Sequence, residues 1–355
     1  MHRKGILLSD EAASEYYKLV WRLATEGYSL MYTLQPFCIW IDTVCGCKNM
    51  SIILNELKQI YSIIGIELIK ESMNSSIYLV ESRYGKTILK LYYNTVRYHR
   101  GITSLKVLQS KDEYIPRLFA YGLMEKFQCG YIIEEYIEGD ILKTVYKNLP
   151  EKSKKDVLYQ AGAILGEINA VTDERLLCEE FNDCGAAAND WLMEQADKLK
   201  EWSIKCQYLN EFLETPLKEH IGRLNRRLFR LKNKMKPTLI HGDYGFRNIL
   251  VRDKHIKGII DFEYGMIADI QYDLSKLIFN DIDFEKHAEL RNIFLRAWEK
   301  NANEKVDWEK LWIFLAIQGL GAVQWVDRQK GKNYKENLDY KIKGIQIFKK
   351  AMERV

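Results

Sequence analysis

Apolar runs in the first half of the chain predict a small antiparallel sheet. Residues 77–80 read Ile-Tyr-Leu-Val and residues 87–92 read Thr-Ile-Leu-Lys-Leu-Tyr, and the segment 83–86 between them, Arg-Tyr-Gly-Lys, favours a turn. A third apolar run, residues 130–137, predicts a buried strand that leads into a crossover. The first half therefore contains at least one hairpin and a strand that can pair with it.

The second half has the period of helices, interrupted by two short strands. Five apolar residues recur at spacings of four and three and predict a long helix before Pro237: Leu217, Ile221, Leu224, Leu228 and Leu231. The arginines on its other face are better explained by solvent exposure than by nucleic-acid binding. Residues 249–251 and 256–260 are β-prone and flank a charged turn, so we expect them to pair. The pattern indicates an α+β protein.

Two acids and one amide near these strands have the spacing of a phosphoryl-transfer site. His241, Asp243 and Asn248 form an H-x-D-x-x-x-x-N sequence, and Asp261 follows the second apolar strand. In kinases the Asp of this sequence orients the attacking hydroxyl, while its Asn and a later Asp bind Mg²⁺ through oxygen. We expect Asp243 to be the catalytic group and Asn248 and Asp261 to be the metal ligands.

Lys90 is the candidate for binding nucleotide phosphates. It lies in the middle of the apolar strand 87–92, where an ammonium group is costly unless it faces a polar site. A lysine on an exposed edge strand is the alternative explanation.

These motifs resemble the aminoglycoside phosphotransferase and choline kinase superfamily, and the resemblance covers about residues 50–355. The matching motifs are His241-Gly242-Asp243, Asn248, Ile260-Asp261-Phe262 and Tyr272-Asp273-Leu274. The resemblance implies a two-lobed protein-kinase-like fold, with an antiparallel sheet in a small N-lobe and a mostly helical C-lobe. It places the N-lobe at residues 49–136 and the C-lobe at 137–355, after an N-terminal extension of residues 1–48 whose helix begins near Ser9.

The resemblance also implies that the chain binds ATP, or GTP, with Mg²⁺. Ser75 and Ser76 stand in the position of the loop that covers the phosphates, and the backbone of Glu135 and Ile137 in the position of the hinge that meets the base. One expected residue is missing, because the family places a glutamate on the helix after the lysine strand. No Asp or Glu occurs between Leu91 and Ser110.

The acceptor is expected to be a small molecule. The Tyr272-Asp273-Leu274 motif follows Asp261 within about a dozen residues, which leaves no room for the activation segment of protein kinases. An acidic cluster after Asp261 fits a cationic, hydroxylated substrate, first of all an aminoglycoside-like antibiotic, and hence a role in antibiotic resistance. Its proposed members are Glu263, Asp269, Asp281 and Asp283. The alternative is that Asp273 is a buried structural acid and the other acids are surface residues.

Two alternatives remain open at this stage. Asp261-Phe262-Glu263-Tyr264 also resembles choline and ethanolamine kinases, and sugars are a further class of acceptor. The missing helix glutamate keeps open a catalytically silent binding protein on the same scaffold, similar to the spore-coat relatives of the family.

Composition limits the classes of binding partner and the expected location of the protein. The net charge of +4 over 355 residues does not indicate nucleic-acid or membrane binding. The apolar stretch from Leu30 to Ile41 is too short to span a bilayer. Seven cysteines without a paired C-x-x-C motif favour reduced thiols and a cytoplasmic location.

Overall fold

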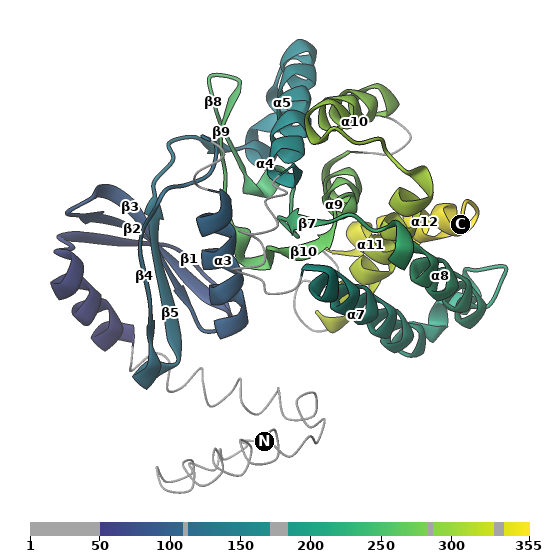
Figure 1. The fold of residues 1–355 in the computed structure, drawn as a ribbon, viewed down its shortest axis with the longest axis horizontal. Helices are drawn as coiled ribbons and strands as arrows, with labels where there is room; N and C mark the ends of the chain where they lie inside the picture. The colour runs from purple at the N-terminus through teal and green to yellow at the C-terminus, as the bar shows by residue number, and fades with distance from the viewer. Residues whose placement is uncertain (1–49, 109–112, 171–183, 283–286, 330–336) are drawn as a thin grey trace, which may run out of the picture. The chain divides into compact units, whose positions relative to one another are not determined.

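The computed structural model describes residues 50–108, 113–170, 184–282, 287–329 and 337–355, and Figure 1 shows the fold. The chain divides into two compact units, Met1–Ile64 and Gly65–Val355. In the first unit, residues 50–61 form a helix in which Ile53 and Leu57 are buried. The extension expected over residues 1–48 lies outside the described residues. Every motif singled out in the sequence falls in the second unit.

A five-stranded antiparallel sheet begins the second unit, with the strand order β1-β2-β3-β5-β4. The strands are β1 (Gly65–Glu71), β2 (Ser75–Ser82), β3 (Gly85–Tyr92), β4 (Leu118–Met124) and β5 (Cys129–Glu135). The β2–β3 hairpin lies where the sequence predicts it, with Ser82 opposite Gly85. Gly85 has a φ of 81°, a conformation that glycine adopts without steric cost.

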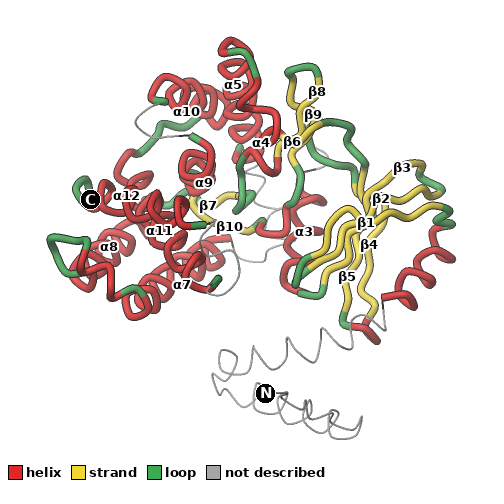
Figure 2. Tube along the Cα trace, turned by 180° about the vertical axis from the view of Figure 1, so that it is seen from behind, coloured by secondary structure: helices red, strands yellow, loops and turns green. Residues whose placement is uncertain are grey.

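Helix α3 (Thr95–Leu108) connects β3 to β4. Asn94 caps its first turn, because its side-chain oxygen accepts a hydrogen bond of 3.1 Å from the backbone N–H of Arg97. Figures 1 and 2 both show α3 between the sheet and the helical part of the unit. The approach is close, since a Cβ atom at Gly265 would lie 2.0 Å from Ser104 Oγ of α3. A side chain larger than glycine's hydrogen at position 265 would push the helix away.

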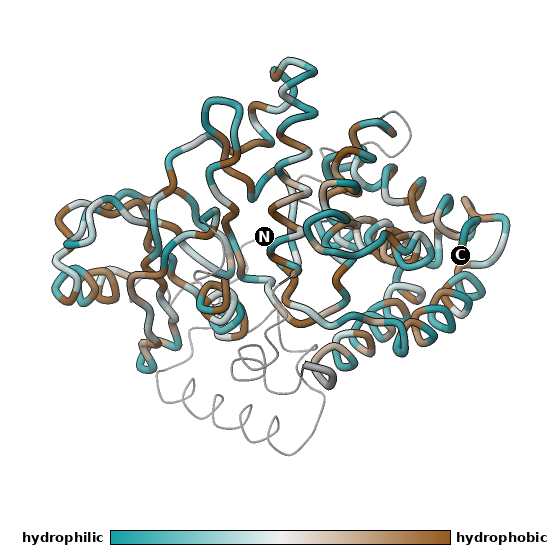
Figure 3. Tube along the Cα trace, turned by 45° about the horizontal axis from the view of Figure 1, so that its top comes forward, coloured by the Kyte–Doolittle hydropathy of each residue, from teal (hydrophilic) through white to brown (hydrophobic). Residues whose placement is uncertain are grey.

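Helices dominate the rest of the unit. They are α4 (Leu142–Val145), α5 (Glu151–Asn169), α7 (Cys184–Lys205), α8 (Leu217–Leu231), α9 (Tyr272–Asp281), α10 (Ala288–Ala302), α11 (Trp308–Arg328) and α12 (Leu338–Met352). In Figure 3 hydrophobic positions recur along these helices between hydrophilic ones. Helix α11 is buried over most of its length and lies in the centre of the helical core. None of the described helices is long and apolar enough to cross a membrane.

Helix α8 confirms the periodicity read from the sequence. All five leucine and isoleucine positions of the predicted stripe are buried. The arginine face is turned outward, and Arg227 forms an ion pair of 2.6 Å with Glu309 at the start of α11. This face therefore also ties α8 to the neighbouring helix.

The tryptophans of α11 differ from one another in burial. Trp312 is buried, as core packing requires, but Trp308 and Trp325 are each nearly half exposed because they lie on the outward face of the helix. Trp308 lies under the guanidinium of Arg291, and Trp325 makes an edge-on contact with Tyr340. Both exposed rings therefore contact neighbouring side chains.

Short strands carry the residues of the candidate site. Strand β7 (Pro237–Ile240) pairs with β10 (Met266–Asp269), and β8 (Ile249–Arg252) pairs with β9 (His255–Ile259) as the sequence predicts. A short strand β6 (Asp140–Ile141) completes the second sheet. The turn between β8 and β9 contains Asp253 and Lys254 at φ values of 53° and 66°, the conformation of a tight hairpin.

The contact between α5 and α10 gives a test of the packing. A Cβ atom at Gly162 of α5 would lie 2.2 Å from the backbone oxygen of Phe294. We expect Gly162→Ala to lower the free energy of unfolding by about 1–3 kcal/mol because the two helices must separate. The matched control is Gly222→Ala on α8, where the nearest atom is the flexible end of Arg226 at 3.5 Å.

The control should raise the free energy of unfolding by about 0.5–1 kcal/mol through helix propensity. Urea unfolding followed by circular dichroism measures both variants. Equal effects of the two substitutions would contradict the packing of α5 against α10.

Candidate active site

A buried ion pair joins β3 and β5. Lys90 Nζ lies 2.7 Å from Glu134 Oε1, and the two side chains are only 6% and 4% exposed. Lys90 pairs with Ile132 and Glu134 pairs with Ile88, so the two charged side chains are diagonal neighbours on one face of the sheet. Burial is the largest effect and favours the neutral amine, but Glu134, Tyr92 and Asp261 together outweigh it and the pKa of Lys90 is raised. Lys90 therefore stays charged inside the sheet.

Glu134 supplies the acid that the sequence seemed to lack. No acidic residue is present on α3, and the partner of Lys90 comes from the adjacent strand instead. The argument that identified Lys90 also applies to Glu134, since a carboxylate in the apolar run 130–137 is costly unless it is paired. The sequence contained this signal, but the strand pairing that brings the two charges together was not known.

Helix α3 makes a different ionic contact. Arg97 NH1 lies 2.6 Å from Glu263 Oε1, which follows Asp261 in the chain. The same guanidinium lies 4.6 Å from the centre of the Tyr264 ring. Helix α3 is thus linked to the segment after Asp261 through the Arg97 side chain, whereas Lys90 is paired inside the sheet.

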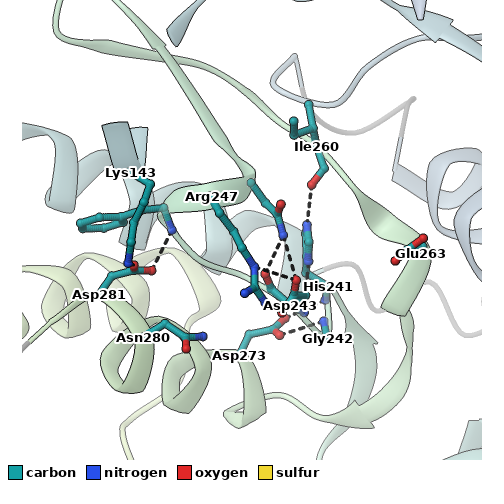
Figure 4. A network of polar contacts seen from close by, with 12 residues as sticks. Lys143, His241, Gly242, Asp243, Arg247, Ile260, Glu263, Asp273, Asn280 and Asp281 are labelled. Carbon is teal, nitrogen blue, oxygen red and sulfur yellow. Dashed lines mark hydrogen bonds and ion pairs between the residues drawn. The ribbon is translucent and has the colours of Figure 1, made fainter. Parts of the chain in front are cut away.

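The candidate catalytic loop, residues 241–248, brings Asp243 close to Arg247 (Figure 4). It also brings Asp243 close to Asn248. Asn248 Nδ2 donates hydrogen bonds to Asp243 Oδ2 at 3.1 Å and to the Asp243 backbone oxygen at 2.9 Å. The amide nitrogen is used inside the loop, so the Asn248 side-chain oxygen remains as its possible metal ligand. Arg247 also binds the Asp243 carboxylate, with a distance of 3.1 Å from Nε to Oδ2.

A fully buried carboxylate fixes the start of this loop. Asp273 accepts hydrogen bonds from the backbone N–H of His241 at 2.7 Å and of Gly242 at 2.9 Å. Burial raises the pKa of Asp273, although His241 and the two N–H groups oppose this effect. Gly242 has a φ of 76°, and a Cβ atom there would lie 2.3 Å from the backbone oxygen of Tyr264. Only glycine fits this turn.

His241 links the catalytic loop to the strand end that bears Asp261. Its Nδ1 accepts a hydrogen bond from the backbone N–H of Asp243, so the other ring nitrogen, Nε2, donates to the backbone oxygen of Ile260 at 3.0 Å. The backbone N–H of Ile260 in turn donates to the backbone oxygen of Asn248 at 2.9 Å. These bonds hold Asp261 beside the loop that contains Asn248.

Asp261 has the features of a ligand residue. Its backbone is left-handed, with φ 71° and ψ 60°, which costs a non-glycine residue about 1–2 kcal/mol. Its carboxylate makes no hydrogen bond or ion pair with the residues that the structure describes. Its charge acts on Lys90, after the larger effects of burial and Glu134. Asp261 thus has a strained backbone and an unpaired carboxylate whose charge acts on Lys90.

The donor set fits Mg²⁺ held jointly with a nucleotide. Among the described residues, no group of three or more His, Cys, Asp or Glu side chains could hold a metal. Asn248 and Asp261 offer only oxygen ligands, and Mg²⁺ is commonly held by one or two protein groups together with substrate phosphates. A Mg²⁺ ion that takes its remaining ligands from nucleotide phosphates agrees with the two oxygen donors and with the lack of a larger ligand group among the described residues.

The two serines expected at the phosphates have other hydrogen-bond partners. Ser75 closes a turn with Ser72, whose backbone N–H donates to the Ser75 oxygen at 2.9 Å. Ser76 is fully buried, and its hydroxyl lies 2.6 Å from the hydroxyl of Tyr93. The hydroxyl of Ser76 therefore faces the sheet, which leaves the backbone of the turn as the part that can approach a phosphate.

The two hinge residues differ in what they offer. The Glu135 side chain forms a two-bond ion pair with Arg117, at 3.1 and 3.2 Å, so it is not available to a base. Ile137 packs its side chain toward Gly258 of β9. Its backbone N–H has no hydrogen-bond partner within the described ranges. A free amide at this position suits an adenine or guanine edge.

The structure does not gather the predicted acids into one acceptor cluster. Glu263 pairs with Arg97. Asp269 has no exposed surface and pairs with Lys310 at 2.8 Å, contrary to the expectation that it contacts an acceptor. The reason is that β10, which ends at Asp269, pairs with β7 inside the helical core.

Asp281 also has internal partners. Its side chain is 3% exposed and forms an ion pair of 2.6 Å with Lys143, and it accepts a hydrogen bond of 2.8 Å from the backbone N–H of Phe246. It thereby holds the middle of the catalytic loop against α9. Asp283 lies outside the described residues.

The sequence comparison assigns the family. A sequence model of the phosphotransferase enzyme family matches residues 65–311, more than half of the chain. The chain belongs to this family. It is a kinase-like phosphotransferase that acts on hydroxyl groups. A comparison with curated proteins gives no match.

Solved structures of aminoglycoside phosphotransferases share the fold of this phosphotransferase. A candidate enzyme from Ralstonia eutropha has a TM-score of 0.60 at 13% identity, over 85% of this chain and 97% of that one. The gentamicin complex of APH(2″)-IIa has a TM-score of 0.58 at 19% identity, over 83% and 94%. The GDP and kanamycin complex of APH(2″)-IIIa has a TM-score of 0.56 at 17% identity, over 82% and 94%. At these identities the likeness establishes the two-lobed fold.

The Lys90–Glu134 pair gives a test of the nucleotide side. We expect Glu134→Leu to lower the free energy of unfolding by about 3–5 kcal/mol, because it leaves a buried ammonium without a counter-charge. The double variant Lys90→Met with Glu134→Leu removes both charges and should recover most of this loss.

Nucleotide binding separates a functional pair from a merely structural one. The double variant should fold but no longer be stabilised by Mg-ATP in a thermal shift assay. If the double variant bound Mg-ATP as well as wild type does, the pair would have a structural role alone.

Proposed function

We propose that this protein is an Mg²⁺-dependent O-phosphotransferase that transfers the γ-phosphoryl group of ATP, or GTP, to a hydroxyl group of a small molecule. The observation that carries this proposal is the combination at one site of a paired, charged Lys90, an unpaired and strained Asp261, and the Asp243–Asn248 loop. Family membership supports the same class of reaction.

Each residue has a distinct role in the proposed reaction. Lys90, oriented by Glu134, neutralises charge on the nucleotide phosphates. Asn248 and Asp261 would hold Mg²⁺, whose contribution is to neutralise the charge that develops on phosphate oxygens. Asp243 accepts a hydrogen bond from the acceptor hydroxyl and takes its proton as the oxygen bonds to phosphorus. Asn248 and Arg247 keep the Asp243 carboxylate in the required orientation.

The acceptor is proposed here only as a hydroxylated small molecule. Gentamicin and kanamycin are the ligands of two related structures, and an aminoglycoside-like antibiotic is the first expectation from the sequence. In this chain, however, Glu263, Asp269 and Asp281 are each paired with a cation of the protein. Amino alcohols and sugars therefore belong in the same screen as aminoglycosides.

The catalytically silent alternative loses the argument that supported it. That argument was the absence of an acid on α3 to hold the lysine. Glu134 holds Lys90 from β5 at 2.7 Å, so the absence of a helix acid no longer indicates inactivity. Consumption of nucleotide with a screen of hydroxylated compounds tests the enzyme directly.

The metal site can be tested without knowing the acceptor. Asp261→Ala should abolish the part of the Mg-ATP thermal shift that depends on Mg²⁺, because it removes the only carboxylate expected to bind the metal. Asp156→Ala, at an exposed position of α5, is the matched control and should behave as wild type. An unchanged Mg²⁺-dependent shift in Asp261→Ala would exclude Asp261 as the ligand.

Asp243 is tested with an acceptor identified in the screen. Asp243→Asn should lower kcat at least ~100-fold, the lower end for positioned acid–base groups, and change KM for nucleotide little. A structural role would instead lower activity and melting temperature together. A stable variant with nearly normal kcat would remove Asp243 from the mechanism.

A further inference from the structure

Excess positive charge lies on the side of Asp243 that is occupied by the C-terminal end of α9. Figure 4 shows Asn280 and Asp281 on one side of Asp243 and Glu263 on the other. On the side of Asn280, Arg247 binds Asp243 while its side chain stays 57% exposed. The carboxylate of Asp281 on this side is already neutralised by Lys143.

Lys276 adds a second cation on this side. It lies on α9 four residues before Asn280 and three after Asp273, and hence on the same face of that helix as both. It is partly buried, and its Nζ is 5.7 Å from the centre of the Tyr272 ring. No carboxylate among the described residues is within ion-pair distance of it. Burial acts to lower the pKa of Lys276, but Tyr272 and Asp243 act in the opposite direction and the pKa is raised. Lys276 is therefore a charged group without an ion-pair partner.

The same side offers neutral hydrogen-bonding groups. The Tyr340 hydroxyl donates to Asn280 Oδ1 at 3.0 Å, which leaves the Asn280 amide nitrogen as a donor. Tyr340 shares electrostatic neighbours with Lys276, namely Arg247 and Asp243. Once the ion pairs Asp243–Arg247 and Asp281–Lys143 are formed, the charge of Lys276 remains uncompensated.

We propose that the acceptor carries an anionic group, a carboxylate or a phosphate, near its reacting hydroxyl, and that Lys276 and the exposed part of Arg247 bind this group. This inference rests on the proposed function, because it assumes that Asp243 receives the acceptor hydroxyl. It makes Lys276 a residue that determines specificity. A cationic acceptor would be repelled by the positive charges of Lys276 and Arg247 beside Asp243. Repulsion of this kind is one way in which a binding site excludes other ligands.

The experiment measures binding of matched probes to the full chain. The nucleotide site is first filled with Mg²⁺ and the non-hydrolysable analogue AMP-PNP, so that anions cannot bind in place of the phosphates. Four sugars of different charge are then titrated: gluconate, glucose 6-phosphate, glucose and kanamycin. The shift in melting temperature gives an apparent Kd for each.

We expect gluconate or glucose 6-phosphate, and not kanamycin, to stabilise wild type, and the preferred one reveals whether the anion is a carboxylate or a phosphate. Lys276→Gln should weaken that binding by about tenfold. Lys276→Arg keeps the charge and should restore most of the binding. Lys300→Gln, at an exposed position of α10, is the control and should match wild type.

The possible failures are distinguishable. If Mg-AMP-PNP stabilises the protein but neither anion adds stability, or kanamycin binds more tightly than both, the anionic acceptor is excluded while the proposed function stands. Anion binding that is equal in wild type and Lys276→Gln excludes Lys276. If Mg-AMP-PNP itself has no effect, the proposed function fails and the acceptor inference fails with it.

Discussion

The requirement that a buried charge be neutralised inside the sheet is the constraint on which this site depends. Lys90 and Glu134 are almost completely removed from water, and either alone would be costly to bury. Together they are compatible with the apolar strands β3 and β5, because the strand register places them diagonally on one face. The pairing of β3 with β5 and the position of the Lys90 ammonium group are thus linked by one interaction.

A second chain of contacts runs through the helical part and orders the catalytic loop. It starts at Asp273 on α9, passes through the backbone of His241 and Gly242, and continues through the His241 ring to the strand end before Asp261. Each step is a hydrogen bond to a backbone group, so the geometry depends little on which side chains the loop exposes. Side chains that the loop exposes can therefore differ while the backbone of His241 and Gly242 keeps its place.

The sequence predicted the fold and the motifs of the site more accurately than the ion-pair partners of the site residues. The hairpin at 83–86, the leucine stripe of α8 and the β8–β9 pair follow from local periodicity and turn chemistry, and the structure has each of them. The partner of Lys90 was missed because it depends on which strands are neighbours, a long-range property. The acidic cluster was misleading for the same reason, since Lys310, far away in the sequence, neutralises Asp269.

Lys90 is paired with β5 and not with α3, and this has a consequence for how the site could be controlled. In kinases whose lysine pairs with a helix glutamate, displacement of that helix breaks the pair and switches the site off. Here both partners of the lysine pair belong to one rigid sheet, so displacement of α3 leaves the pair intact. A ligand or protein that moved α3 would act instead through Arg97 on Glu263, and hence on the segment that contains Asp261.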